Sequence, residues 1–227
     1  MKKLIKLSYD INPEMPLFPG TPPVSISRHK DISKGDSSNT FLFTMQNHSG
    51  THIDAPRHSY EYGKNISDYS LKDLFFENPM IIDCHKEAEG SISVEDLSSL
   101  STQKEEFDIL LIRTGFSRYR KNDPDLYSNK NPFLSPEAAE WLRGKFPNLK
   151  ALGVDCISIT SCVNREAGRK SHKILLDDTR IGSSPVLIVE DLDLSLAGER
   201  LDNVMVAPIF IEGLDSAPCT AIGVIDD

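Results

Sequence analysis

The sequence predicts a single α/β domain over residues 1–227, built on a mixed β-sheet with flanking helices. Short runs rich in Ile, Leu and Val recur along the chain, and each is about as long as one strand. Helix-start signals lie between several of these runs, as expected when strands and helices alternate. The sequence contains no internal repeat, linker or low-complexity tract. With 227 residues, of which 39% are hydrophobic, the chain can bury a core without disulfides.

The first quarter of the chain contains three expected strands. Residues 4–10 alternate apolar and polar side chains, which is typical of a half-buried strand. Residues 12–23 include five prolines and a glycine, which exclude a helix or a central strand there. Residues 24–28 and 40–46 are again strand-like. We expect these three strands to pair in an antiparallel or mixed sheet.

The rest of the chain alternates further strands with helices and loops. Strands are expected at residues 79–84, 108–113, 149–154, 185–190, 203–211 and 220–225. The long polar run at residues 118–131 is expected to be a surface loop.

Three helices are expected between these strands. Ser93 and Asp96 form a capping box, which predicts a helix over the residues that follow. Ser135 followed by Pro136 predicts a second helix that runs to about residue 146. Residues 165–176 carry charged side chains on one side and apolar side chains at their end, which predicts a third helix.

The chain is acidic, with a formal net charge of −9 and a pI near 5.2. This charge repels phosphate backbones and anionic lipid, so we expect no nucleic-acid partner and no membrane partner. The absence of a signal-peptide pattern and of an apolar run of about 20 residues predicts a cytoplasmic protein. The four cysteines are scattered without a CxxC pair, which argues against both a disulfide framework and a cysteine-type zinc site.

Three of the six histidines lie in one short segment, HSGTHIDAPRH at residues 48–58. Imidazole nitrogens and carboxylate oxygens are the ligands of zinc and of other divalent first-row metals. Three protein ligands with one open position are typical of a catalytic metal site rather than a structural one. His48, His52 and Asp54 are therefore candidate ligands of a catalytic metal.

The backbone of this segment is expected to be a strand end that runs into a tight loop. The first two histidines have the i, i+4 spacing of HExxH metalloproteases, but no Glu follows the first, and Pro56 disfavours a helix before it. Gly50 permits a positive φ, and Thr51 can hold a ligand in place by a hydrogen bond. Spacing alone leaves three roles open for His58, which are a fourth ligand, a general base beside the metal-bound water, and a surface residue.

The pattern HxGTHxDxPxH resembles the signature of the metal-dependent cyclase family, which includes bacterial kynurenine formamidase (arylformamidase) and isatin hydrolase. The similarity covers most of the chain. It extends from YDI at residues 9–11 and PLFPGTPP at residues 16–23, through GVD at residues 153–155, to the end. The resemblance implies the swivelling β/β/α cyclase fold.

The resemblance also implies roles for individual residues. Three positions of the motif match metal ligands: His48, His52 and Asp54. Asp54 can bridge to a second metal, and His58 matches the acid/base histidine. The family's second metal site uses a histidine before a Leu pair and a glutamate that ends the following strand, which His172 and Glu190 match. One or two divalent ions per chain are therefore expected, with zinc as the first choice and manganese as the second.

The sequence departs from the family pattern in ways that bear on the substrate. Phe18 stands where the kynurenine formamidases tend to have tryptophan, and Thr220 stands where they have an arginine, after the element Asp215-x-x-Pro218. Extra residues at 177–185 are expected to reshape the rim of the pocket. The proline-rich loop around Phe18 is a candidate lid, because this ring can stack on a flat organic substrate.

Together these features predict a metal-dependent hydrolase of a small amide, similar to arylformamidase, that acts on N-formylkynurenine or a related formamide. Two alternatives stay open: a hydrolase of cyclic amides of the isatin or lactam type, and a catalytically idle metal-containing binding protein. The expected partner is a small-molecule substrate. The family resemblance further implies a homodimer or homotetramer.

Overall fold

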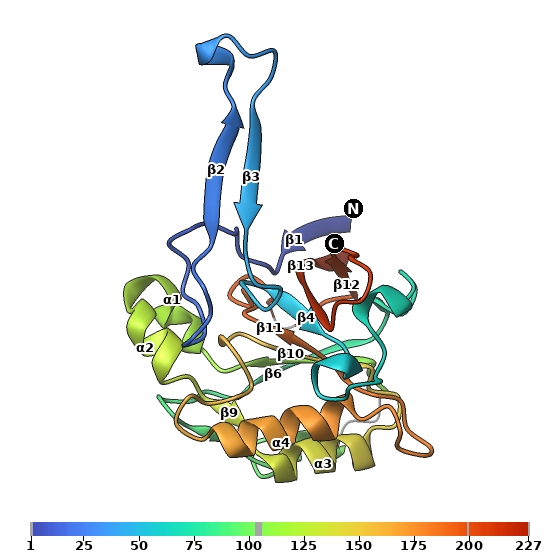
Figure 1. Cartoon of the computed structure of the whole chain (residues 1–227). Coiled ribbons are helices and arrows are strands. Elements are labelled where there is room, and N and C mark those ends of the chain that lie inside the picture. The colour runs from blue at the N-terminus through green and yellow to red at the C-terminus, as the bar shows by residue number, and fades with distance from the viewer. Residues whose placement is uncertain (1, 103–105, 199, 227) are drawn as a thin grey trace.

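The computed structural model describes residues 2–102, 106–198 and 200–226, and its centre is a nine-stranded mixed sheet (Figure 1). Eight strands follow one another in the order β5-β12-β13-β4-β11-β10-β8-β6, and β1 also pairs with β13. The strands are β1 (Lys2–Lys6), β4 (His52–Asp54), β5 (Phe75–Phe76), β6 (Pro79–Asp83), β8 (Ile109–Arg113), β10 (Ala151–Val154), β11 (Leu187–Glu190), β12 (Asn203–Pro208) and β13 (Ser216–Asp226).

The sheet is parallel on one side and antiparallel on the other. Strands β6, β8, β10 and β11 are parallel, whereas β4 runs antiparallel to both of its neighbours, β11 and β13. Helix α3 (Pro136–Lys145) lies between β8 and β10 in the chain, and α4 (Arg165–Leu176) lies between β10 and β11. Such crossovers are what parallel neighbours require. The predicted α/β fold with a mixed sheet is therefore confirmed.

Both faces of the sheet are buried against apolar side chains at its central parallel strands. On β8, Leu110 and Ile112 belong to one hydrophobic core, while Ile109 and Leu111 belong to the other. A strand covered on both faces is expected to be apolar at every position, because successive side chains point to opposite faces. The first core includes residues of α3 and α4, and Figure 1 shows these two helices lying together along one side of the sheet.

The predicted strand pair in the first quarter forms a separate hairpin, β2 (Ser25–Lys30) with β3 (Thr40–Thr44). The pairing of these two strands is as expected, but the N-terminal strand does not join them. Strand β1 pairs with β13 instead, and the hairpin stands off the body of the molecule (Figure 1). A second small sheet joins β7 (Ser91–Ile92) to β9 (Phe133–Leu134).

Two of the three predicted helices form where local signals placed them. Ser135 caps α3 by accepting a hydrogen bond from the backbone amide of Ala138, and Pro136 occupies the first turn. Helix α4 begins after Asn164, whose side chain caps it in the same way, and it has the predicted bounds.

The segment expected to be a surface loop is largely helical. It contains α1 (Tyr119–Asn122) and α2 (Pro124–Asn129). Asp123 caps α2 by accepting from the amide of Leu126, and Tyr127 is fully buried. The loop prediction was wrong because a local cap and one buried aromatic ring outweigh the polar composition of the segment.

The helix predicted after Ser93 does not form as an α-helix in the described residues. Asp96 accepts a hydrogen bond from the amide of Ser93 at 2.7 Å, and the amide of Asp96 donates to the hydroxyl oxygen of Ser93 at 3.4 Å, as a capping box requires. The chain then forms only a 3₁₀ turn, because four of the five residues of Ser98–Thr102 are serine or threonine, which compete for backbone hydrogen bonds. The 3₁₀ helices are Ile32–Lys34, Pro56–His58, Ile66–Asp68, Ser98–Thr102 and Phe116–Arg118.

The cysteines and the helices bear on two classes of protein that the sequence argued against. The four cysteines are free, as their spacing predicts. Among the described residues, no helix has the length and apolar character that crossing a membrane would demand.

Candidate active site

Strand β4 brings two of the predicted ligands together at the centre of the sheet. His52 and Asp54 are two residues apart, so their side chains point to the same face. The antiparallel register with β11 places Glu190 directly opposite His52, and such pairs share a face. Strand pairing thus joins candidate ligands that are 138 residues apart in the chain.

The turn before β4 orients His52. Gly50 has φ of +68°, in the left-handed region that favours glycine. Its carbonyl oxygen lies 2.8 Å from Nδ1 of His52, so this nitrogen donates and Nε2 is left to face the site. Thr51, predicted to hold a ligand side chain, instead donates to the carbonyl oxygen of Asp191 at 2.5 Å and thereby fixes the backbone next to Glu190.

Helix α4 orients His172 in a similar way. Nδ1 of His172 lies 3.0 Å from the carbonyl oxygen of Gly168, one turn earlier, and 3.1 Å from the hydroxyl of Thr160. The helix packs so closely on this loop that a Cβ at Gly168 would lie 2.5 Å from Cα of Thr160. Only glycine allows this approach, which leaves Nε2 of His172 3.4 Å from Oε1 of Glu190.

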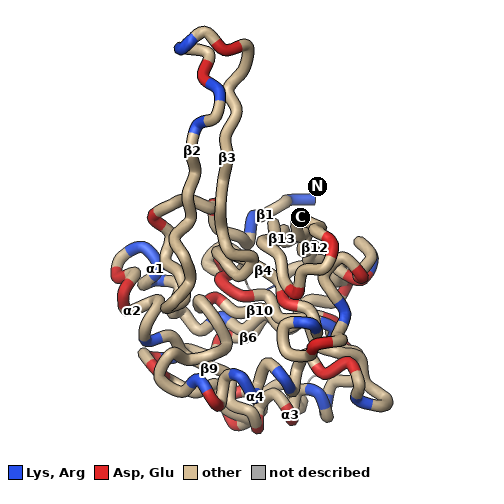
Figure 2. Tube along the Cα trace, viewed as in Figure 1, with Lys and Arg blue, Asp and Glu red and all other residues tan. Residues whose placement is uncertain are grey.

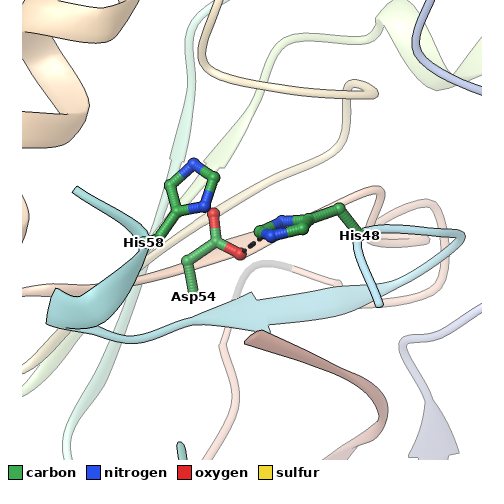
Figure 3. A group of neighbouring side chains, drawn as sticks. All are labelled: His48, Asp54 and His58. Carbon is green, nitrogen blue, oxygen red and sulfur yellow. Dashed lines mark ion pairs between the residues drawn. The ribbon is translucent and has the colours of Figure 1, made fainter. Parts of the chain in front are cut away.

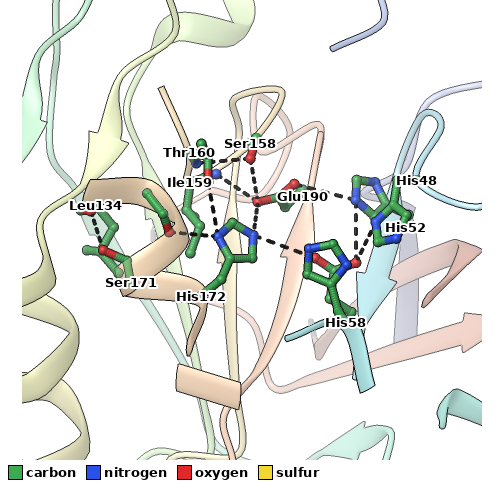
Figure 4. A network of polar contacts seen from close by, with 12 residues as sticks. His48, His52, His58, Leu134, Ser158, Ile159, Thr160, Ser171, His172 and Glu190 are labelled. Atoms are coloured by element: carbon green, nitrogen blue, oxygen red, sulfur yellow. Dashed lines mark hydrogen bonds and ion pairs between the residues drawn. The ribbon is translucent and has the colours of Figure 1, made fainter. Parts of the chain in front are cut away.

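Glu190 is held from both sides. Oε1 accepts hydrogen bonds from the hydroxyl of Ser158 at 2.9 Å and from the amide of Ile159 at 2.7 Å. Oε2 lies 3.4 Å from Nε2 of His52. Figure 4 shows that these contacts, together with those of His172, form one continuous polar network.

Asp54 lies at the centre of the predicted ligands. Its side chain is 1% exposed, and neither carboxylate oxygen has a hydrogen-bond partner among the described residues. Oδ1 lies 3.1 Å from Nδ1 of His48, and Oδ2 lies 3.8 Å from Nε2 of His172. Figure 3 shows the carboxylate between the rings of His48 and His58.

The donor atoms fit a divalent metal. Buried carboxylate oxygens are rarely left without partners, and a coordinated cation would satisfy both oxygens of Asp54. The possible ligand atoms form two groups, and within each group all atoms lie within 4.8 Å of one another. Both groups include Asp54. The groups are His48, Asp54 and His58, and His52, Asp54 and Glu190. Four of the five predicted ligands belong to these groups, and the fifth, His172, lies 3.8 Å from Oδ2 of Asp54.

The electrostatics of the site favour positive charge. Burial lowers the pKa of His48, but the charges and hydrogen bonds of Asp54 and Asp215 outweigh this effect and raise it to about 10. Burial raises the pKa of Glu190, yet its contacts with two histidines bring the value down to about 2. The carboxylates therefore stay ionised and stabilise a cation at the centre of the site.

His58 lies beside the ligands, paired with a residue that sequence reasoning missed. Oδ2 of Asp215 lies 3.0 Å from Nδ1 of His58 and 2.8 Å from Nε2 of His48, and Asn47 donates to Oδ1 at 2.7 Å. From the sequence, Asp215 was named only as the first residue of the element that precedes Thr220, and it was given no role in the site. It precedes β13, 157 residues after His58, so no local spacing could have connected them.

A second missed group supports the backbone next to Glu190. Asp191 has φ of +54°, unusual for a residue other than glycine. The guanidinium of Arg120 donates two hydrogen bonds to its carboxylate, both 2.8 Å long, and the hydroxyl of Tyr127 donates a third at 2.7 Å. Both partners come from the helical segment that had been expected to be a loop, and they hold the strand end that carries the ligand.

The ligand cluster forms the floor of a cavity of about 470 Å³. Phe18 lines this cavity, as predicted for a substrate-binding residue, and the guanidinium of Arg165 lies 5.9 Å from the centre of its ring. The remaining lining residues outside the cluster are Thr21, Gln46, Ser59, Ile157, Ser158, Thr160, Arg169 and Lys173. The loop at residues 177–185 contributes none of the lining residues, so its expected effect on the rim is not borne out. Arg143 instead fastens it to α3 through Ser183 and Ser184.

Comparisons with known proteins show which sequences this chain is similar to. A family model described as "Putative cyclase" matches residues 5–161. An uncharacterized protein from Haemophilus influenzae is 31% identical over 128 residues, which cover 56% of this chain and 89% of that protein. A kynurenine formamidase from Bacillus cytotoxicus is 29% identical over 219 residues, which cover 96% of this chain and 95% of the relative.

The fold is also shared with a solved structure. Isatin hydrolase A from Ralstonia solanacearum superposes with a TM-score of 0.81 at 19% sequence identity. The superposition covers 99% of this chain and 92% of that chain.

Proposed function

Because this chain belongs to the cyclase family, we propose that it is a divalent-metal-dependent hydrolase that cleaves the C–N bond of a small amide, with an arylformamide as the first substrate class. One observation carries the proposal. Two groups of possible ligand atoms share the carboxylate of Asp54, which is buried at the floor of an open cavity and has no hydrogen-bond partner among the described residues. The similarity to a kynurenine formamidase over almost the full length of both chains supports the choice of an arylformamide.

The residues that would hold the metal are His48, His52, Asp54, His172 and Glu190. Nitrogen and carboxylate ligands without a thiolate suit zinc and manganese, with zinc the first choice. A metal bound there would lower the pKa of a water molecule and polarise the scissile carbonyl. His52, Asp54 and Glu190 form one group of possible ligand atoms without His58, and His48 and His172 also lie near Asp54, so the site could hold one ion or two.

His58 would transfer the protons. Asp215 accepts from Nδ1 of His58, which leaves Nε2 free to accept a proton from the attacking water. Attack forms the bond between the water oxygen and the carbonyl carbon. His58 then returns the proton to the departing nitrogen as the C–N bond breaks. For an arylformamide, the products are formate and an aryl amine.

Hydrolysis of a cyclic amide is the second candidate function. The shared fold with isatin hydrolase A favours it, because opening such a ring needs the same attack on a carbonyl carbon. The close placement of His58 beside the ligands argues against an idle metal-binding protein, since binding alone requires no proton-transfer group there.

Metal analysis paired with turnover tests the function. The purified protein is expected to contain one to two equivalents of zinc or manganese by mass spectrometry, and to hydrolyse N-formylkynurenine. Chelation should remove the metal and abolish turnover, and adding the metal back should restore it, because the water is activated only at the metal. Metal without turnover of formamides would shift the function to cyclic amides. A protein that takes up no metal would contradict the proposal.

We further propose that the hairpin at residues 24–44, called the arm below, contacts a second copy of the chain. Opposed residues share a face, so Ile26, Phe41 and Phe43 lie on one face of the arm. The two phenylalanines are 53% and 62% exposed. An isolated two-stranded hairpin is only marginally stable in water, and an exposed apolar face of this kind is typical of an interface.

The body of the chain offers a surface of the same character. The outer face of the β1-β13-β12-β5 part of the sheet carries Leu4, Phe75 and Met205, which are 67%, 37% and 36% exposed. A two-fold homodimer can place the arm of each copy on this face of the other copy.

Replacing both phenylalanines is expected to separate the copies. The variant Phe41→Ser with Phe43→Ser should have a mass near 25.3 kDa by light scattering, whereas the native protein should have twice that mass or more. Leu42→Ser is the matched control, because Leu42 is 59% exposed on the opposite face of the arm, and it should stay dimeric. A monomeric native protein, or a double variant that stays dimeric with native circular dichroism, would contradict the interface.

A further inference from the structure

The mouth of the active-site cavity carries the opposite charge to its floor. Asp54 and Glu190 lie at the floor and are buried. Arg169 and Lys173 line the mouth and are exposed. Within the described ranges, neither cation forms an ion pair with an acidic side chain. A substrate that enters the cavity therefore meets two unpaired positive charges before it reaches the ligand cluster.

These cations belong to a concentration of positive charge on α4. The helix has four cationic residues and one acidic residue, a net charge of +3 in a chain whose net charge is −9. Figure 2 shows this basic character along α4. Arg165, Arg169 and Lys173 follow one another at intervals of four residues, which places them on one side of the helix. Like charges at this spacing destabilise a helix, so the row does not serve helix stability.

The three members of the row have different surroundings. Arg165 lies over the ring of Phe18, in the position of a cation–π contact, and so supports the aromatic wall of the cavity. Arg169 and Lys173 have no such ring contact in the described part of the chain, and both side chains border the cavity directly. Since they are one helical turn apart, about 6 Å along the axis, one small anion can contact both.

We propose that Arg169 and Lys173 bind a carboxylate of the substrate. The inference rests on the proposed amide hydrolysis and specifies its substrate class, an aromatic amide that carries a carboxylate. The flat ring would lie between Phe18 and Ile157, both of which line the cavity, and the amide carbonyl would reach the floor. Guanidinium and ammonium groups bind carboxylates through charge-assisted hydrogen bonds, which would orient the amide toward His58.

A matched pair of substrates tests the carboxylate directly. The metal-loaded enzyme is assayed with N-formylanthranilate and with its methyl ester, which has the same formamide but no negative charge. In Arg169→Gln and in Lys173→Gln, the KM for the acid should rise about tenfold, because a charged hydrogen bond is lost at a solvent-exposed site. The KM for the ester should stay unchanged, and kcat should change little for either substrate.

Lys170→Gln is the control on the same helix, because Lys170 is exposed but does not line the cavity. It removes the same charge from α4 and should leave the KM of both substrates unchanged. If all three variants raise the KM for the acid equally, the effect comes from the general charge of the helix, and the assignment of a binding pair is wrong. Equal losses for acid and ester would also overturn it.

Binding of a product-like anion separates this inference from the proposed function. Calorimetry with anthranilate needs no turnover, and its Kd should rise about tenfold in Arg169→Gln and in Lys173→Gln but not in Lys170→Gln. If the metal-loaded enzyme hydrolyses neither formamide yet shows this pattern, the function fails for formamides while the anion site stands. If anthranilate does not bind the native enzyme, or binds all variants equally, the anion site is wrong whatever the turnover.

Discussion

Asp54→Asn is expected to abolish metal binding and to lower turnover at least about 100-fold. This loss is larger than the one expected for a residue that only hydrogen-bonds to a metal ligand. Asp54 is the residue common to both groups of possible ligand atoms, and neither of its oxygens has a hydrogen-bond partner in the described residues. An asparagine of the same shape carries no negative charge to balance the metal, and its amide nitrogen cannot coordinate it. Mass spectrometry of the variant after dialysis against zinc or manganese measures the stoichiometry, and N-formylkynurenine hydrolysis measures the rate.

Asp125→Asn is a suitable control, because Asp125 is exposed on α2 and lies outside the cavity. It should keep both metal and activity. Circular dichroism is expected to show that both variants are folded, since Asp54 makes no hydrogen bond that the fold requires. An Asp54→Asn enzyme with the native metal content would show that the bridging carboxylate is not a ligand.

His58→Ala is expected to keep the metal and to lower kcat by about 10²- to 10⁴-fold, the range typical of a lost general acid/base. Metal retention is expected because four other predicted ligands surround Asp54 without it: His48, His52, His172 and Glu190. KM should change little, since the role of His58 is proton transfer rather than substrate binding. Steady-state kinetics and metal analysis of the same sample provide both measurements.

Two companion variants complete this test. Asp215→Asn removes the charge that orients His58 and should lower kcat by a smaller factor, about 10- to 100-fold. His85→Ala removes an exposed histidine outside the cavity and should have no effect. If His58→Ala loses the metal, His58 is a fourth ligand, one of the roles that spacing left open, and the acid/base assignment falls.

The sequence was informative wherever the signal is local. The cap at Ser135 predicted one major helix, and the pattern of charged and apolar residues at 165–176 predicted the other, because each signal depends only on neighbouring residues. The density of histidines at residues 48–58 predicted a metal site for the same reason. The capping box at Ser93 shows the limit, since its hydrogen bonds form while the residues that follow do not continue an α-helix.

Tertiary structure decided whatever depends on residues distant in the chain. The pairing of β4 with β11 and β13 places Glu190 opposite His52 and brings Asp215 to His58, contacts that no spacing encodes. The resemblance to a family had named Glu190, but not Asp215. The projection of the arm and the position of Arg169 at the cavity mouth were likewise invisible in the sequence. The motif by itself determined the chemistry of the ligands, because ligand types are set by residue identity. Only the folded sheet decided which charges meet, because electrostatic and hydrogen-bonding partners are chosen by distance in space and not by distance along the chain.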